Sequence, residues 1–386
     1  MIIDKFKPYI FNGDIKKFIS PPFDIITWEQ EYNLRSRNEN IINLTIPDKV
    51  TGMKGSKTIL DRWLNENIIN LYDREIIIIL KQSFNFNKEM LTRYGIISLV
   101  EINDDIKPHE NTFEKQVYDR KNIMKNLNSQ LEPIFIVVPD NNFDRLIRRE
   151  SVLLEEKYKF EEPSGVINYV YFLDDPEKIN KIKDSLKNIT GVVADGHHRL
   201  RAIRELYSET DDNFWKFAMS YITSIYDNGL MIGGVHRLVY GINFEVNINK
   251  IKNFFDIRIT KNIENGENIY IYSNNKFYEM IPKEYILNEK FDGSGPLPTG
   301  VINKVLFEEA LSMKEKEMGE KVRYIYNYTD AINAVDQHEC DFAILIPSWQ
   351  KERFLKLILE NKILPQKSTY FYPKIPSGIA IYQRPS

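Results

Sequence analysis

Cysteine is almost absent from this sequence. Cys340 is the only cysteine among 386 residues, which excludes disulfide bonds within the chain and cysteine-rich zinc sites, and which is typical of a reducing compartment. No pattern around Cys340 indicates a catalytic thiol, so we expect it to be a small buried hydrophobic residue. The low cysteine content therefore favours a cytoplasmic protein.

Long hydrophobic runs are also missing. The longest aliphatic run, Ile76-Ile77-Ile78-Ile79-Leu80, is far too short to cross a bilayer but suits a buried strand. Charged residues interrupt the segment from Met1 to Lys7, where a signal peptide needs an unbroken apolar stretch. We expect the chain to be neither secreted nor membrane-spanning.

The sequence also lacks an excess of positive charge. It has 52 Lys and Arg against 55 Asp and Glu, a net charge of -3, and the two signs are interspersed without a long basic run. The broad positive surface of a non-specific nucleic-acid binder is therefore missing. No clear helix-turn-helix with a basic recognition helix is present either, so we expect no nucleic-acid partner.

Apolar and aromatic residues, by contrast, are plentiful. Hydrophobic residues make up 42% of the chain, with 22 Phe and 22 Tyr, which is enough to fold by burial alone. A chain this long exceeds what one core usually supports, so we expect two domains. We place their boundary near Gly241, with residues 1–240 as the first domain and residues 241–386 as a C-terminal αβ domain.

Residue periodicity predicts an α/β fold with a mixed sheet. Segments rich in Ile and Val predict strands at residues 75–86, 93–102, 134–138, 166–173 and 190–194. Helical patterns follow at residues 114–127, 143–157 and 178–186, and later at 329–336 and 352–359, between strands at 322–326 and 342–346. We expect one hairpin between residues 75–86 and 93–102, and a second between 218–225 and 229–235 that turns at Asp227-Asn228-Gly229.

Histidine is rare, and its distribution is the main clue to function. Of five histidines, four lie in polar clusters: His109, His197, His198 and His236. The densest cluster is Asp195-Gly196-His197-His198-Arg199, where a short apolar strand runs into a helix. Amides at a helix N-terminus favour an anion, glycine permits close approach of a phosphate, and Arg199 supplies a fixed cation.

Asp195 has two candidate roles in this block. Its carboxylate can cap the helix or hold a magnesium ion. The two adjacent histidines point in different directions on a helix, so one can face a ligand while the other packs behind it. A capped helix with two surface histidines is the plain alternative, but the density of reactive residue types after an apolar strand favours a functional site.

Three further clusters contain residues that suit phosphate chemistry. His109-Glu110-Asn111-Thr112, followed by Asp119-Arg120, offers a base and a carboxylate on a loop after a strand; a loop with an N-capping Asn111 or Thr112 is the equal alternative. His236-Arg237 ends a strand, and Pro21-Pro22-Phe23-Asp24 is more typical of a rigid turn than of a catalytic aspartate.

The last cluster is Pro365-Gln366-Lys367-Ser368-Thr369-Tyr370-Phe371-Tyr372-Pro373-Lys374. Lysines and hydroxyls on a loop can bind phosphate, and aromatic rings can stack on a base. Packed aromatic residues with surface lysines are the equally weighted alternative. We include Lys367, Ser368, Thr369 and Lys374, with His109, Arg120, His236 and Arg237, among the candidate phosphate-binding residues.

These blocks, in this order, resemble the signature blocks of the domain of unknown function 1015 family, and they cover nearly the whole chain. The Asp195 to Arg199 block alone is similar to the phosphate-binding segment of the ParB/sulfiredoxin superfamily, which includes the free serine kinases. This second resemblance implies a ParB/sulfiredoxin-like core with a C-terminal αβ elaboration, and a helix after Asp195 that cradles nucleotide phosphates. Glu110 is our choice of general base from chemistry alone.

The sequence is compatible with three functions. The leading one is a nucleotide-dependent phosphotransferase, acting on a small hydroxyl compound such as free L-serine, with ATP or ADP as donor and magnesium on Asp195. In it Gly196, His197, His198 and Arg199 hold the phosphates. The second is a metal-dependent hydrolase with His109, Glu110, Asp195 and His197 as ligands, and the third is a non-catalytic, nucleotide-switched binding module. The expected partners are a small molecule and a nucleotide, and a homo-oligomer is left open.

Overall fold

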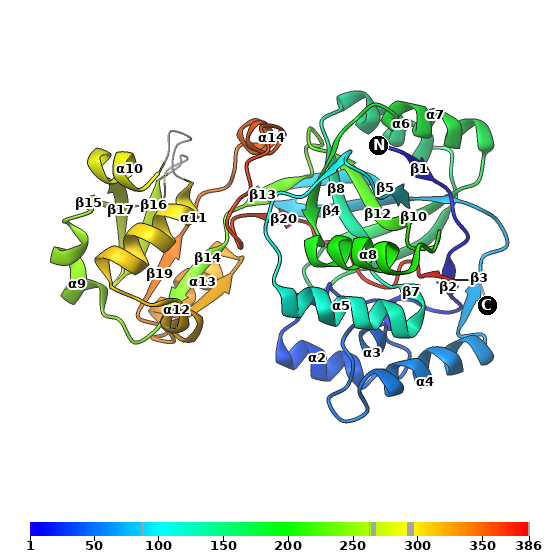
Figure 1. Cartoon of the computed structure of the whole chain (residues 1–386), viewed down its shortest axis with the longest axis horizontal. Coiled ribbons are helices and arrows are strands. Elements are labelled where there is room, and N and C mark those ends of the chain that lie inside the picture. Colours follow the sequence, from blue (N-terminus) through cyan, green and yellow to red (C-terminus); the bar gives the residue numbers. More distant parts are fainter. Residues whose placement is uncertain (87, 262, 264–267, 292–296, 385–386) are drawn as a thin grey trace. The chain divides into compact units, whose positions relative to one another are not determined.

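The computed structural model describes residues 1–86, 88–261, 263, 268–291 and 297–384. The chain forms two compact units (Figure 1). The first unit comprises Met1–Leu230, Ile358–Ile363 and Pro373–Ser386, and the second comprises Met231–Leu357 and Leu364–Tyr372. The second unit thus starts before the boundary expected near Gly241, and two C-terminal segments return to the first unit.

The first unit is built on a mixed sheet. Within the described residues the sheet has nine strands in the order β6-β11-β8-β12-β5-β4-β10-β9, with β1 also beside β5. These strands are β1 (Ile3–Asp4), β4 (Ile77–Phe86), β5 (Glu89–Glu101), β6 (Ile106–Lys107), β8 (Ile134–Val138), β9 (Glu156–Glu161), β10 (Ile167–Leu173), β11 (Gly191–Asp195) and β12 (Phe217–Ser224). β11 is parallel to β6 and β12 is parallel to β8, whereas the other pairs are antiparallel. The α/β class with a mixed sheet is confirmed.

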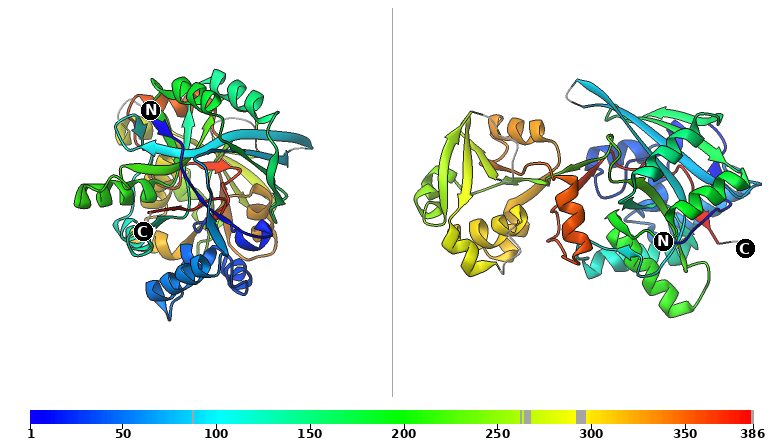
Figure 2. Two further views of the ribbon diagram at one scale, coloured as in Figure 1. Left: turned by 90° about the vertical axis from the view of Figure 1, so that its right-hand side faces the viewer. Right: turned by 90° about the horizontal axis from the view of Figure 1, so that it is seen from above.

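β4 and β5 form the first predicted hairpin, which is confirmed. Their register runs from Ile78 opposite Ile97 to Phe86 opposite Glu89. Its far end, light blue in the right-hand view of Figure 2, projects beyond the other strands, and Met90 there is exposed. Four helices precede these strands: α1 (Ile15–Phe18), α2 (Trp28–Arg35), α3 (Ile42–Thr45) and the longer α4 (Gly52–Asn65).

The two faces of this sheet differ in polarity. Side chains alternate between faces along a strand, and Ile77, Ile79, Ile96 and Ile136 point to one face, where they form the main core. Four helices contribute to this core: α5 (Glu114–Leu127), α6 (Asn141–Ser151), α7 (Pro176–Leu186) and α8 (His197–Thr210). The opposite face carries buried polar residues as well as apolar ones, and Asp195 belongs to it because it pairs with Phe135 across the ladder.

Local patterns predicted several helices and strands closely. The helix at residues 114–127 and the strand at 134–138 are confirmed as α5 and β8. The helix expected at 143–157 is partly wrong, because α6 ends at Ser151 and β9 begins at Glu156. Val152 and Leu153, directly after the end of α6, are exposed and do not pack on the core.

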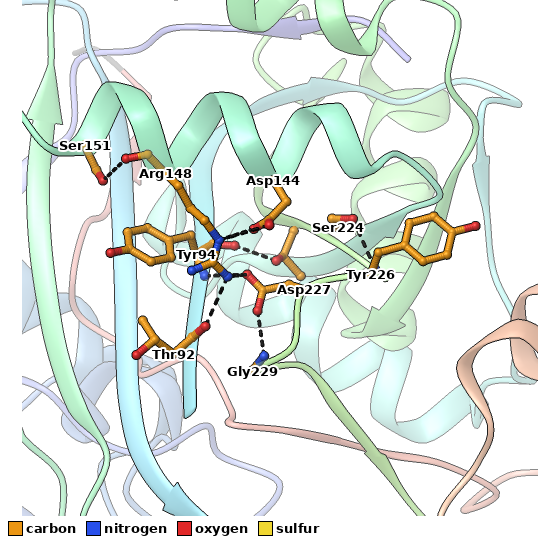
Figure 3. A network of polar contacts seen from close by, with 10 residues as sticks. Thr92, Tyr94, Asp144, Arg148, Ser151, Ser224, Tyr226, Asp227 and Gly229 are labelled. Carbon is orange, nitrogen blue, oxygen red and sulfur yellow. Dashed lines mark hydrogen bonds and ion pairs between the residues drawn. The ribbon is translucent and has the colours of Figure 1, made fainter. Parts of the chain in front are cut away.

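The second predicted hairpin, at Asp227, is wrong. β12 ends at Ser224 and pairs with β5 and β8, while β13 (Met231–Gly233) pairs with β20 (Tyr370–Tyr372). The turn between them is held by Asp227, a fully buried carboxylate that accepts hydrogen bonds from the backbone N–H groups of Tyr94 and Gly229 and from Arg148 Nη2 (Figure 3). Arg148 also binds Asp144, so the turn is fastened to α6 instead of closing a hairpin.

The second unit contains a six-stranded antiparallel sheet within the described residues. Its order is β15-β17-β16-β19-β14-β18. The strands are β14 (His236–Val239), β15 (Phe255–Thr260), β16 (Ile269–Ser273), β17 (Lys276–Pro282), β18 (Val322–Ile325) and β19 (Phe342–Leu345). α9 (Phe244–Ile251) and the π-helix η1 (Val301–Ala310) pack on one face, and α13 (Tyr328–Asp336) packs on the other.

The αβ alternation expected in the C-terminal part is confirmed by β18, α13, β19 and α14 (Lys351–Leu359). The segment from residue 365 to 374, expected as a loop, contains the short strand β20. Cys340 is buried in the second unit, as expected, and burial raises the pKa of its thiol to about 11. In the described parts of the chain no helix is both long and apolar enough to span a bilayer.

Candidate phosphate-binding site

The junction between β11 and α8 turns on Gly196. Its φ is 88°, in the left-handed region that favours glycine, and a Cβ there would lie 3.0 Å from Arg199 Nη2. Gly196 is the N-cap residue, and no side chain caps the helix. The expectation that the Asp195 carboxylate caps α8 is therefore wrong. The first backbone N–H groups of the helix, at the positive end of its dipole, are suited to bind an anion.

Asp195 lies between two cations instead. Its Oδ2 is 3.2 Å from Arg199 Nη2, and its Oδ1 is 3.3 Å from Lys374 Nζ. Burial of the Asp195 carboxyl opposes ionisation, but Lys374 and Arg199 outweigh it and hold its pKa at about 2. The carboxylate is therefore ionised at neutral pH and fixes both cations beside the helix N-terminus.

Arg199 is almost completely buried. Its Nη1 donates to the carbonyl oxygen of Pro133 at 2.8 Å and lies 4.0 Å from Glu132 Oε2. Its Nε is buried and has no hydrogen-bond partner among the described residues. A buried N–H without a partner costs free energy, so this donor is suited to an acceptor on a ligand.

Glu132 forms the other side of the cluster. Its Oε1 accepts hydrogen bonds from Ser377 Oγ at 2.7 Å and from the backbone N–H of Phe23 at 3.3 Å. The Pro21 to Asp24 block thereby joins the site through its backbone. Arg120 lies over the Phe23 ring, 3.9 Å from the centroid, and donates to the carbonyl oxygen of Thr45.

Three cations, Arg120, Arg199 and Lys374, gather near this cluster. Burial lowers the pKa of Arg120, the carboxylates Glu132, Asp119 and Asp24 raise it, and Arg199 lowers it further. These charged side chains therefore interact electrostatically. Asp195 itself contacts two cations, Arg199 and Lys374, and the N-terminus of α8 adds partial positive charge beside them.

Two of the predicted histidines come together. His109 Nδ1 donates to the carbonyl oxygen of Val193 and lies 3.1 Å from His197 Nε2, which accepts the backbone N–H of His109 at 3.3 Å. Burial lowers the pKa of His109 to about 4 and lowers the pKa of His197 well below its ordinary value. Both imidazoles are therefore neutral near pH 7 and leave the positive charge to Arg199 and Lys374.

His198 has different surroundings. Its Nε2 accepts the backbone N–H of Phe113 at 3.1 Å, and its ring stacks on Phe113. Glu110 follows His109 in the chain and is half-buried. Thr112, an alternative cap in the sequence analysis, accepts a hydrogen bond from Arg201 of α8 instead, and the N-cap of α5 is Phe113 without a side-chain bond.

The remaining candidate residues form a cluster within the second unit. His236 Nδ1 accepts the backbone N–H of Ile346, and burial lowers its pKa to about 4. Arg237 is buried, donates to the carbonyl oxygen of Val235, and has no partner for Nε among the described residues. Lys367 Nζ donates to Tyr326 Oη at 3.3 Å, Ser368 Oγ donates to the carbonyl oxygen of Pro365, and Thr369 is half-buried.

The structure also bears on metal binding. In the described portion of the chain, no three His, Cys, Asp or Glu side chains are grouped so that they could hold a metal ion. The four-ligand set expected for a hydrolase, His109, Glu110, Asp195 and His197, is therefore not formed. The donors that do meet, His109 and His197, bind each other and the carbonyl oxygen of Val193.

Sequence reasoning missed Glu132, Gln82 and Arg93. Glu132 stands between Leu131 and Pro133, directly before the buried strand β8, and is itself buried. Gln82 and Arg93 interrupt the apolar strands β4 and β5. A charged or amide residue inside an otherwise apolar run was the available signal, because such groups are buried only with partners.

Comparison with known families gives a match over most of the chain. A family model described as "Protein of unknown function (DUF1015)" matches residues 6–306. The chain belongs to the DUF1015 family. The resemblance drawn from the sequence blocks is thereby confirmed, and no curated protein matches this DUF1015 chain significantly.

Several solved structures are similar to it at low identity. A conserved hypothetical protein from Pyrococcus furiosus has a TM-score of 0.41 at 15% identity, covering 74% of this chain and 95% of its own. A free serine kinase in complex with AMP has a TM-score of 0.40 at 15% identity, covering 73% and 92%. SbnI from Staphylococcus aureus, truncated at its C-terminus, has a TM-score of 0.39 at 12% identity, covering 74% and 87%. Likenesses of this size carry no argument about the function of this chain.

Proposed function

We propose that the β11–α8 junction binds the phosphates of a nucleotide, and that this DUF1015 protein is a nucleotide-dependent phosphotransferase acting on a small hydroxyl compound. One observation carries the proposal. The N-terminus of α8 has no side-chain cap and is accompanied by Arg199, Lys374 and Arg120, of which Arg199 keeps a buried Nε–H without a partner among the described residues. The ParB/sulfiredoxin-like core belongs to the same proposal.

The residues divide the task between them. The backbone at Gly196 allows close approach of a phosphate, and Arg199 and Lys374 neutralise its charge. Asp195 holds these two cations in place, and neutral His109 and His197 offer hydrogen bonds without adding charge. Phosphoryl transfer needs chiefly positioning and charge neutralisation, which this set supplies.

We assign Glu110 as the general base that takes the proton of the acceptor hydroxyl. Glu132 is another carboxylate nearby, but it is held by Ser377 Oγ and the Phe23 amide and lies 4.0 Å from Arg199. Those bonds suit a positioning role better than proton transfer. Glu110 is half-buried and adjoins His109, within the same segment as the site.

The residues present do not fit magnesium held by the protein. Both oxygens of Asp195 lie against cations, at 3.2 and 3.3 Å, whereas magnesium prefers carboxylate and phosphate oxygens without competing positive charge. We therefore derive no step through magnesium, and we assign Asp195 to the two cations.

A phosphotransferase assay tests the proposal. Purified protein is incubated with ATP or ADP and with hydroxy amino acids, free L-serine first, and the phosphorylated product is detected directly. We expect turnover in the wild type, its loss in Asp195→Ala, and a large fall in kcat with little change in KM in Glu110→Gln. Absence of turnover with every acceptor would rule out the phosphotransferase activity. Tight nucleotide binding without turnover would favour a non-catalytic binding module instead.

A further inference from the structure

A row of buried polar side chains crosses the polar face of the first unit's sheet. Asn168 of β10 is opposite Gln82 of β4, and Gln82 is opposite Arg93 of β5. All three side chains are fully buried. Burying polar groups in the middle of a sheet is unfavourable unless their hydrogen bonds are made, so the bonds of this row indicate its purpose.

The bonds of Gln82 are directional. Its Nε2 donates to Asn168 Oδ1 at 2.9 Å and to the carbonyl oxygen of Lys374 at 3.0 Å, while its Oε1 accepts from Arg93 Nη2. The amide nitrogen is a donor only, and the guanidinium cannot accept. Only one orientation of the amide satisfies all three partners, so Gln82 is fixed.

The ends of the row hold Gln82 in this orientation. Arg93 lies over the rings of Phe135 and Tyr221, 4.8 and 5.2 Å from their centroids. At the other end Asn168 Nδ2 donates to Glu162 Oε1 at 2.7 Å. The row is therefore anchored on both sides of its middle residue.

The residue that Gln82 holds is part of the candidate site. Lys374 presents its carbonyl oxygen to Gln82 and its ammonium to Asp195 Oδ1. Three residues further on, Ser377 exchanges two backbone hydrogen bonds with Ser20 and donates its hydroxyl to Glu132. The strap of residues 373–378 is thus attached at Lys374 by the polar row and at Ser377 by Ser20 and Glu132.

We infer that Gln82 is a positioning residue for the phosphate site: it fixes the backbone of Lys374, so that the lysine ammonium stays beside Asp195 and the N-terminus of α8. Arg93 and Asn168 act through Gln82. The importance of Lys374 to a ligand rests on the proposed function, but its position does not.

The reactivity of the Lys374 amine tests this position without a ligand. Gln82→Glu keeps an acceptor for Arg93 but cannot donate to Lys374 or Asn168. The full-length chain is treated with acetic anhydride, and the acetylation rate of each lysine is followed by mass spectrometry. Lys374 is 8% exposed in the wild type, and we expect it to react about ten-fold faster in Gln82→Glu because its backbone anchor is lost.

Two controls make the result specific. Gln130 is also buried, and its side chain bonds backbone groups of β12, the carbonyl oxygen of Phe217 and the N–H of Met219, so Gln130→Glu should leave the acetylation of Lys374 slow. Lys121, paired with Glu205 and Glu209 on α8, reports general loosening. An unchanged Lys374 rate in Gln82→Glu would overturn the inference, as would an equal rise at Lys121. Should Gln82→Glu not fold, Gln82→Met, which removes both polar atoms of the amide, should raise the acetylation rate of Lys374 in the same way.

A double-mutant cycle with ATP binding tests the route of the effect. We expect Gln82→Glu to weaken ATP binding about ten-fold in the wild type and less than about two-fold in Lys374→Met, because both changes act through one ammonium. Independent, additive losses would overturn the inference. Equal ATP affinity in wild type and Lys374→Met would instead overturn the proposed phosphate role, while the acetylation rates still decide the position of Lys374.

Discussion

Two aspartates of the first unit have opposite electrostatic settings. Asp195 is partly buried, with 20% of its side chain exposed; desolvation opposes its ionisation, but Lys374 and Arg199 lie against it and hold its pKa at about 2. Asp227 is fully buried, and burial raises its pKa to about 6. Its ion-pair partner Arg148 is shared with a second carboxylate, Asp144.

The surroundings of the two aspartates separate a binding site from an anchor. Around Asp227 the hydrogen bonds from Tyr94, Gly229 and Arg148 use both carboxylate oxygens to fasten a turn (Figure 3). Around Asp195 an added phosphate would meet Arg199, Lys374 and a helix N-terminus without a side-chain cap. An aspartate beside an arginine does not by itself indicate function; the second cation and the uncapped helix N-terminus do.

Removing the arginine from each cluster should have the largest effect. Arg199→Met leaves Asp195 and Glu132 short of a buried cation, and we expect the free energy of unfolding to fall by about 3–5 kcal/mol. Arg148→Met should cost less at pH 6 than at pH 8, because Asp227 can then take up a proton. Urea denaturation at both pH values measures this. A loss in Arg148→Met that does not depend on pH would contradict the contrast.

The two aspartates should also affect stability with opposite pH dependence. The pKa of Asp195 is lowered from 3.8 to about 2, so its contribution is present above pH 3.8 and is lost as the pH falls to about 2. The pKa of Asp227 is raised from 3.8 to about 6, so its contribution is present below pH 3.8 and is lost as the pH rises to about 6.

Comparison with the asparagine variants measures these contributions. The difference in unfolding free energy between wild type and Asp195→Asn should rise with pH by about 2 kcal/mol, and that between wild type and Asp227→Asn should fall by about 3 kcal/mol, each over its window. Denaturation curves from pH 2 to 7 provide the measurement. Two differences with the same sign would show that the cations around Asp195 do not dominate its ionisation.

Alanine at the glycine of each cluster should have a smaller effect. A Cβ at Gly229 would lie 2.5 Å from the backbone nitrogen of Arg93, which cannot easily move, so Gly229→Ala should cost about 1–3 kcal/mol of stability. At Gly196 the Cβ would meet the end of the Arg199 side chain instead of backbone, and the left-handed backbone adds strain of about 1–2 kcal/mol. Thermal unfolding ranks the two, and only Gly196→Ala should also weaken ATP binding. An equal loss of binding in Gly229→Ala would count against the site.

The sequence predicted the structural elements that are determined by residues close together in the chain. α5 and β8 follow from local periodicity, and the Asp195 to Arg199 block was found because its strand, glycine and helix are consecutive. The hairpin at Asp227 was predicted wrongly because β13 pairs with a strand from the far end of the chain. Local turn residues cannot reveal such a partner.

The same limit explains the missing site residues. Gln82 binds the carbonyl oxygen of Lys374 across 292 positions of sequence, and Glu132 binds Ser377 across 245. No spacing rule links residues so far apart, and both Gln82 and Arg93 lie inside strands whose pattern is apolar. The partners of Gln82 and Glu132 lie in the strap of residues 373–378, which the fold brings to them from the far end of the chain.

A crystal structure of the chain with ADP tests the central claim most directly. The account predicts phosphate oxygens within hydrogen-bond distance of the backbone N–H groups at the start of α8, of Arg199 Nε and of Lys374 Nζ. ADP bound elsewhere, with Asp195 still paired to Lys374 and Arg199 and no phosphate beside them, would contradict it.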